Sequence, residues 1–153
     1  MENHQYDQSQ PEFKRTILIG LGGAGKLILT HAKRLFMDAY GVLPPSIKLL
    51  SLDTDRDLFS LRSADGTKEY SLEDHEFLYM KVDNPRSFID AADGNVKEWF
   101  IKPLPIGAIS NGAGAVRQVG RIAFFYHLNE FNRRIDSLLS DLYYQQLYSQ
   151  MAN

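Results

Sequence analysis

The chain has 153 residues, of which 44% are hydrophobic and 24% charged; 17 basic and 19 acidic side chains give a net charge of −2, and cysteine is absent. This composition is typical of one globular domain, and it excludes a disulfide framework, a thiolate nucleophile and a cysteine-type zinc site. The near-neutral charge gives no reason to expect nucleic acid as a partner. Because no run of about 18 apolar residues occurs, we expect no membrane span and a cytoplasmic protein.

The first part of the chain divides into a polar leader and an α/β pattern. Polar composition predicts a flexible leader over residues 1–14, followed by one partial nucleotide-binding domain over residues 15–153. Residues 16–19 are apolar at almost every position, which indicates a strand covered on both faces of a parallel sheet. Apolar side chains then recur at helical spacing over residues 25–40, and Gly41 is placed to end that helix. The expected buried stripe consists of Leu27, Ile28, Ala32, Leu35, Phe36 and Ala39, with Lys33, Arg34 and Asp38 turned outward.

The remaining elements continue the same alternation of strands and helices. Residues 47–52 and 77–82 are strand candidates, and Leu58 and Leu61 suggest a short helix between them. Residues 86–92 indicate one or two helical turns, and the last third predicts helices with a bend near residue 127. A strand, a helix and a strand within 40 residues form a right-handed βαβ unit. The predicted fold class is therefore α/β, a Rossmann-like parallel sheet flanked by helices.

A glycine cluster separates the first strand from the first helix. Gly20, Gly22 and Gly25 satisfy the pattern G-x-G-x-x-G, in which main-chain N–H groups at a helix N-terminus bind an anion. The candidate donors and neighbours of that anion are Gly20, Gly22, Gly23, Ala24, Gly25 and Lys26. The same residues nearly form a Walker A loop, but Leu27 stands where a Ser or Thr should hold Mg²⁺, so we rank that interpretation lower. Lys26 either pairs with a phosphate or is an exposed lysine, and the loop could also be a tight turn that binds nothing.

Two acids follow the second strand. A Rossmann dehydrogenase carries an acid about 20 residues beyond its glycines to bind the ribose, and Asp53 lies later than that pattern prefers. Thr54 and Asp55 could instead cap the short helix that we expect next. Carboxylates beside a phosphate site could also hold Mg²⁺, which makes Asp55 the candidate metal ligand.

A second glycine cluster, Gly112-Ala113-Gly114, precedes the long helical region. It too places main-chain donors at a helix N-terminus. Two loops that follow parallel strands lie on the same edge of the sheet, where ligands of α/β proteins bind. Arg117 could approach an anion there, or it could pair with a surface acid.

Taken together, the three clusters resemble the nucleotide loops of the tubulin/FtsZ superfamily of self-assembling GTPases, including its bacterial tubulin-like branch. Residues 19–25 look like the first loop of the FtsZ group, and residues 52–55 are similar to its second loop. Gly112-Ala113-Gly114, separated by five residues from Gly120-Arg121, has the spacing of the third loop. The resemblance covers roughly residues 15–140.

The resemblance implies a site for GTP or GDP, with or without Mg²⁺, and head-to-tail self-assembly. Leu27 replaces the family's asparagine that is associated with guanine recognition, and the hallmark G-G-G-T-G-[ST]-G loop does not occur in the sequence. We therefore interpret the chain as the N-terminal part of such a GTPase domain, or a degenerate relative, and assign no catalytic residue. Hydrolysis is not expected from this chain alone.

Two alternatives and one structural expectation remain open. A Rossmann NAD(P)-binding module would use only the first loop and Asp53, and a non-catalytic interaction module would bind no nucleotide. In the superfamily a fourth strand lies beside the first, so residues 16–19 should have an unpaired edge here. We expect the chain to dimerise or exchange elements across that edge, or to pair there with the remainder of the same protein.

Overall fold

The computed structural model describes residues 13–92, 94–100, 106–114 and 116–151, so the leader expected over residues 1–14 lies almost entirely outside the described part. A three-stranded parallel sheet with the order β1-β2-β5 forms the centre of the fold. A two-stranded antiparallel hairpin, β3-β4, lies apart from that sheet. The strands are β1 Thr16–Leu21, β2 Ile47–Asp53, β3 Ser60–Arg62, β4 Glu69–Ser71 and β5 Phe77–Tyr79. The helices are α1 Gly22–Tyr40, the 3₁₀ turn η1 Asp74–Glu76, α2 Pro85–Ala91, α3 Gly94–Trp99, α4 Arg117–Tyr126 and α5 Leu128–Met151.

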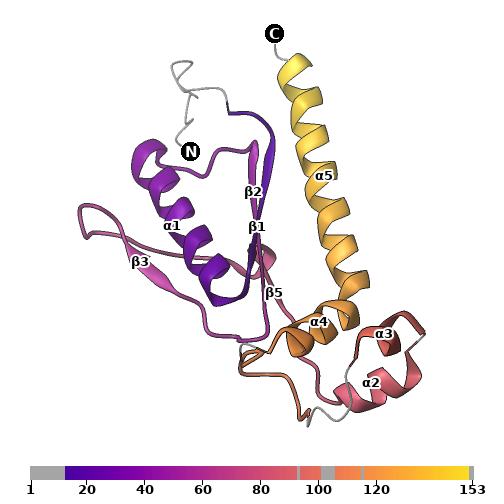
Figure 1. Cartoon of the computed structure of the whole chain (residues 1–153). Coiled ribbons are helices and arrows are strands. Elements are labelled where there is room, and N and C mark those ends of the chain that lie inside the picture. The colour runs from indigo at the N-terminus through magenta and orange to yellow at the C-terminus, as the bar shows by residue number, and fades with distance from the viewer. Residues whose placement is uncertain (1–12, 93, 101–105, 115, 152–153) are drawn as a thin grey trace.

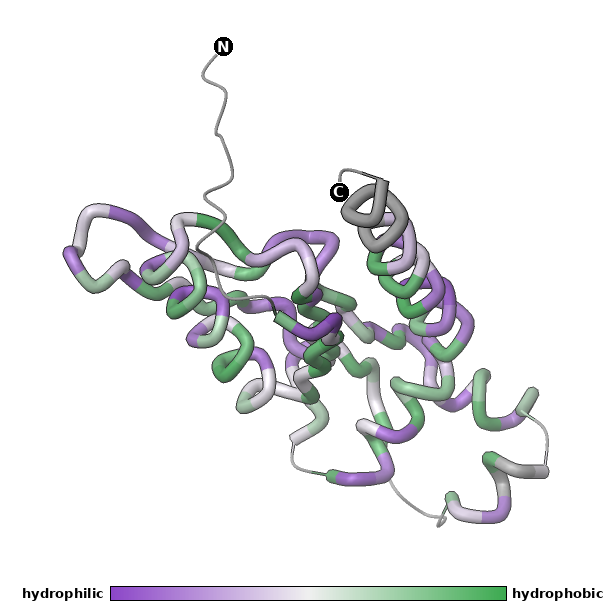
Figure 2. The backbone as a smooth tube through the Cα atoms, turned by 90° about the horizontal axis from the view of Figure 1, so that it is seen from above, coloured by the Kyte–Doolittle hydropathy of each residue, from purple (hydrophilic) through white to green (hydrophobic). Residues whose placement is uncertain are grey.

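Helices cover both faces of the sheet. Figure 1 shows α1 on one side of the strands and α5 on the other, and Figure 2 shows the same arrangement from above. A hydrophobic core lies on each face of the sheet, and the central strand β2 contributes side chains to both because they alternate between the faces. Leu49 packs with Leu29 under α1, whereas Leu50 and Leu52 pack with Ile122 and other residues on the opposite face. The prediction of an α/β fold with a parallel sheet flanked by helices is therefore confirmed.

Most elements predicted from the sequence are present with shifted bounds. The helix expected over residues 25–40 begins three residues earlier, at Gly22, so that the glycine cluster forms its first turn. The expected C-terminal glycine is confirmed, since Gly41 adopts φ +73° and its amide donates to the Met37 carbonyl. The bend expected near residue 127 is also confirmed, because α4 ends at Tyr126 and α5 starts at Leu128.

The short helix expected through Leu58 and Leu61 is wrong. Ser60–Arg62 instead pairs with Glu69–Ser71 as the hairpin β3-β4, and Asp65 closes the turn between them. The spacing of the two leucines fits one helical turn, but hydrogen bonds to a segment farther along the chain decide the outcome.

The predicted inner face of α1 is also wrong in part. Lys33, expected on the outside, is buried, whereas Ile28 and Leu35 are 66% and 60% exposed. On β1, Leu21 and Ile19 are likewise exposed, at 67% and 46%. Among the described residues β1 pairs only with β2, so its other edge is unpaired, as expected.

Within the described residues, no helix combines the length and the apolar character that crossing a membrane requires.

Candidate functional site

The first glycine cluster turns the chain sharply from β1 into α1. A Cβ built on Gly20 would lie 2.6 Å from the carbonyl oxygen of Gly25, so both positions need glycine for this close approach of strand and helix. Gly22 has φ +67°, a conformation that side chains disfavour. The cap residue, Leu21, makes no side-chain hydrogen bond to the helix. Among the residues that the structure describes, the first amides of α1 therefore have neither an intrahelical acceptor nor a side-chain cap.

Lys26 joins this first turn to the second loop. Its Nζ lies 2.9 Å from Asp53 Oδ2 and donates to the Asp55 carbonyl oxygen at 3.1 Å. The side chain is 2% exposed, so Lys26 is not the exposed lysine that the sequence offered as one interpretation. Although the sequence nearly matches a Walker A loop, the ammonium group of Lys26 contacts Asp53 and Asp55 in this structure.

Both carboxylate oxygens of Asp53 are engaged. Oδ2 binds Lys26, and Oδ1 accepts the amide of Asp55 at 3.2 Å. An acid that binds ribose hydroxyls needs a free acceptor that faces the ligand. Asp53 is buried and already paired, so this geometry does not favour the NAD(P)-binding alternative.

Thr54 and Asp55 do not cap a helix, because a β-hairpin follows them. Asp55 Oδ1 accepts the Asp57 amide at 3.2 Å, which forms a local turn and leaves the other carboxylate oxygen without a hydrogen bond from the described residues. The described part of the chain contains no group of three or more side chains suited to hold a metal ion. A cation at Asp55 would therefore need most of its ligands from a phosphate and water.

The third loop lies against the second. The amide of Gly112 donates to the Thr54 carbonyl at 3.1 Å, and Asn111 forms an antiparallel bridge with Asp55. Two further contacts hold the segment that leads into this loop. Ile109 exchanges backbone hydrogen bonds with Val82, and the Tyr79 hydroxyl donates to the Ser110 carbonyl at 2.7 Å. The segment consequently crosses the carboxyl ends of β2 and β5.

The glycines of the third loop adopt positive φ angles, and the space beside Gly114 is open. Gly112 and Gly114 adopt φ +90° and +58°, and a Cβ on Gly114 would meet nothing within 4 Å. Arg117 begins α4 directly after the loop; it is exposed and has no hydrogen bond or ion pair to the described residues. Ala113 packs toward Gly120 of α4, since a Cβ on Gly120 would lie 3.7 Å from that of Ala113. The site residues expected from the sequence thus lie in three loops, or in the first turns of the helices that follow them, at one edge of the sheet, and they are linked through the second loop.

A comparison with protein families decides the family of the chain. A family model described as tubulin-like matches residues 17–150. The chain belongs to the tubulin-like family. The match includes all three loops, so the resemblance seen in the sequence is confirmed at the level of the family. No curated protein and no solved structure matches the tubulin-like chain.

Sequence reasoning missed a buried ion-pair cluster on the other half of α1. Lys33 Nζ binds Glu76 at 2.7 Å and Glu73 at 2.9 Å. Burial disfavours the charged form of Lys33, but the hydrogen bonds with Glu76 and Glu73 outweigh it and raise the pKa of Lys33. The same contact with Lys33 lowers the pKa of Glu73. Two signals were available in the sequence: Lys33 follows Lys26 by two helical turns, and two glutamates three residues apart precede β5.

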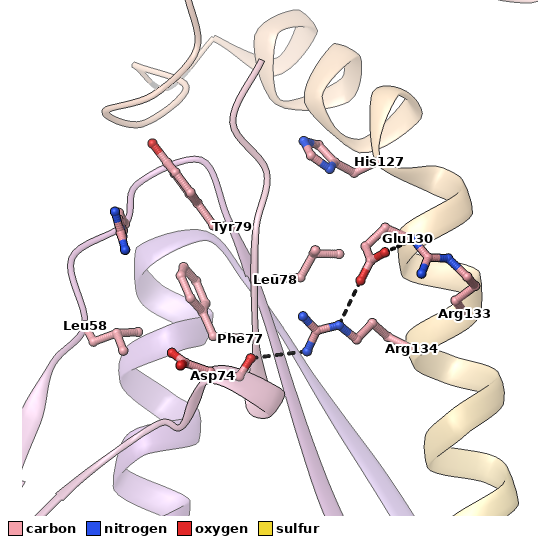
Figure 3. A pocket seen from close by; sticks show the side chains of 10 residues that line it. Leu58, Asp74, Phe77, Leu78, Tyr79, His127, Glu130, Arg133 and Arg134 are labelled. Atoms are coloured by element: carbon pink, nitrogen blue, oxygen red, sulfur yellow. Dashed lines mark hydrogen bonds and ion pairs between the residues drawn. The ribbon is translucent and has the colours of Figure 1, made fainter. Parts of the chain in front are cut away.

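The tubulin-like chain also has an open cavity of about 760 Å³ between β5 and the start of α5 (Figure 3). Arg134 spans its wall, with hydrogen bonds to Glu130 and to the carbonyls of Asp74 and His75. Three of the charged lining side chains are thus paired, since Glu130 forms ion pairs with both Arg133 and Arg134. The lining residues are Arg56, Leu58, Asp74, Phe77, Leu78, Tyr79, His127, Glu130, Arg133 and Arg134.

Proposed function

We propose that the tubulin-like chain binds a guanine nucleotide, GTP or GDP, at the carboxyl edge of its parallel sheet. The observation that carries the proposal is the linkage of three loops there, through Lys26 with Asp53 and through the Gly112 amide with the Thr54 carbonyl. Ligands of open α/β sheets bind at this edge. Membership of the tubulin-like family supports guanine over other bases.

In this proposal the phosphates contact mainly the backbone. Amides of Gly22, Gly23 and Ala24 lie in the first turn of α1, where the helix dipole attracts an anion. On the other side, the glycines of the third loop let main chain approach the phosphates without a Cβ in the way. Arg117, which is exposed, adds a positive charge. Asp55 is the residue that would hold Mg²⁺, together with phosphate oxygens and water.

Gly23 offers a direct test, because a Cβ there would meet nothing within 4 Å and the residue is exposed. A glutamate in the first turn favours an α-helix through its dipole, but it repels a phosphate at the same position. We expect Gly23→Glu to keep or raise the melting temperature and to abolish binding of Mg·GTP in calorimetry. Ala39→Glu, which puts the same charge at the other end of α1, is the matched control and should bind normally.

Measuring the binding of several nucleotides separates guanine-nucleotide binding from the two alternative functions. Calorimetry of the wild-type chain with Mg·GTP, GDP, Mg·ATP and NAD should give the tightest binding for a guanine nucleotide. Preference for NAD would select the Rossmann dinucleotide interpretation. Failure of every nucleotide at millimolar concentration would favour an interaction module that binds none.

We further propose that the free edge of β1 contacts another polypeptide, in the first instance a second copy of the chain. Among the described residues no strand pairs with this edge, and Leu21, Ile28 and Leu35 are exposed and uncharged.

A further inference from the structure

The ammonium group of Lys26 lies in a closed set of contacts. Besides Asp53 Oδ2 and the Asp55 carbonyl, it faces the rings of Phe77 at 5.3 Å and Phe59 at 5.6 Å from their centroids. Two oxygens and two aromatic faces thus surround a side chain that is 2% exposed. A phosphate at the first turn of α1 would have to displace these contacts to reach Lys26.

These contacts come from four separate parts of the fold. Lys26 is on α1, Asp53 ends β2, Phe59 precedes β3, and Phe77 begins β5. The second loop is therefore held to the first turn of α1 mainly through one side chain. That loop in turn accepts the Gly112 amide, so its position also determines where the third loop lies.

Charge gives Lys26 a second role. Asp53 is buried directly beside the proposed phosphate site, and an unpaired carboxylate there would repel a polyphosphate and would itself be costly to bury. The ammonium group of Lys26 cancels this charge at 2.9 Å.

We propose that Lys26 is a positioning residue that serves Asp53, and that it is not a phosphate ligand. It neutralises Asp53 and holds the second loop in place, so that backbone amides and Arg117 bind the nucleotide. This inference rests on the nucleotide binding proposed above, and it assigns to the glycine-loop lysine a role unlike that of the lysine in a Walker A loop.

A double-mutant cycle tests the assignment. Its members are wild type, Lys26→Met, Asp53→Asn and the double variant, with Mg·GTP affinity measured by calorimetry at fixed ionic strength. In the wild-type background Lys26→Met should weaken binding by about tenfold or more, because Asp53 is left unpaired beside the phosphates. In the Asp53→Asn background the same change should alter the affinity by less than about threefold. Lys68→Met, on the exposed hairpin, is the matched control in both backgrounds.

Each of the other outcomes would overturn either the positioning role of Lys26 or the proposed nucleotide binding. If Lys26 contacts phosphate, Lys26→Met would weaken Mg·GTP binding about tenfold in the Asp53→Asn background as well. The same substitution would then also reduce the slope of affinity against salt concentration. A loss well below tenfold in the wild-type background would show that Lys26 has no positioning role. If Lys26→Met does not fold, Lys26→Gln, which can still donate to both oxygens, replaces it. Failure of the wild-type chain to bind any nucleotide would instead overturn the proposed function itself.

Discussion

The backbones of Gly20, at the end of β1, and Gly25, in the first turn of α1, touch so closely that a Cβ on either would lie 2.6 Å from backbone atoms of the other. Backbone cannot move aside as a flexible side chain can. We expect Gly20→Ala to lower the free energy of unfolding by about 3 kcal/mol. The measurement is urea denaturation followed by circular dichroism.

Gly23→Ala provides the comparison for that variant, since its Cβ would meet nothing within 4 Å. It should leave stability unchanged or raise it by about 0.5–1 kcal/mol, because alanine favours a helix over glycine. Equal stability of the two variants would contradict the structure of this turn.

The Lys33 cluster predicts a large loss on removal of its positive charge. Lys33→Met leaves the buried carboxylate of Glu76 without its partner, and breaking a buried pair in this way costs about 3–5 kcal/mol. Urea denaturation should show this loss, whereas Lys68→Met on the exposed hairpin should change stability by less than about 0.5 kcal/mol. The double variant Lys33→Met, Glu76→Gln should recover part of the loss. A Lys33→Met chain as stable as the control would mean that the cluster does not form.

The same cluster predicts how stability depends on pH. The pKa of Glu73 is lowered from 4.5 by its hydrogen bond with Lys33, so its contribution is present above pH 4.5 and is lost as the pH falls through the lower folded-state value. The pKa of Lys33 is raised from 10.5, so its contribution persists up to that pH and is lost only above it. Wild type should therefore be more stable than Glu73→Gln at pH 7, and the difference should vanish under strongly acidic conditions. A difference that stays constant from pH 7 to pH 2 would refute this linkage.

The free edge of β1 predicts self-association. At micromolar concentration we expect sedimentation velocity to show a dimer, because no strand of the described residues pairs with this edge and Leu21 and Ile28 are exposed. Ile28→Lys should shift the chain toward monomer through charge repulsion and loss of apolar contact. Leu139→Lys, at an exposed leucine of α5, should not. A wild-type chain that sediments as a monomer would remove the hypothesis.

The sequence predicted those features that depend on neighbouring residues. The strands β1 and β2, the glycine turn and the glycine cap at Gly41 follow from local apolar runs and backbone conformations. The family resemblance worked because its three loops are short motifs in a fixed order.

The errors arose where distant segments decide the structure. Helical periodicity gives α1 an apolar stripe, but it cannot tell that Glu73 and Glu76 approach Lys33 and bury that side instead. Likewise, the Leu58–Leu61 spacing contains no information about the pairing of Ser60–Arg62 with Glu69–Ser71. The Lys26–Asp53 pair was missed for the same reason, since nothing local joins a helix residue to the end of the next strand.

Lys26 and Lys33 lie two turns apart on one side of α1, a distance of about 10 Å along the axis. One is tied to the loop after β2 and the other to η1, while Asp38 accepts the Ala64 amide from the turn of the hairpin. The helix is thus anchored at three points along its length. We expect a displacement at its glycine end to reach the β3-β4 turn, because that turn is hydrogen-bonded to Asp38 near the other end of the helix.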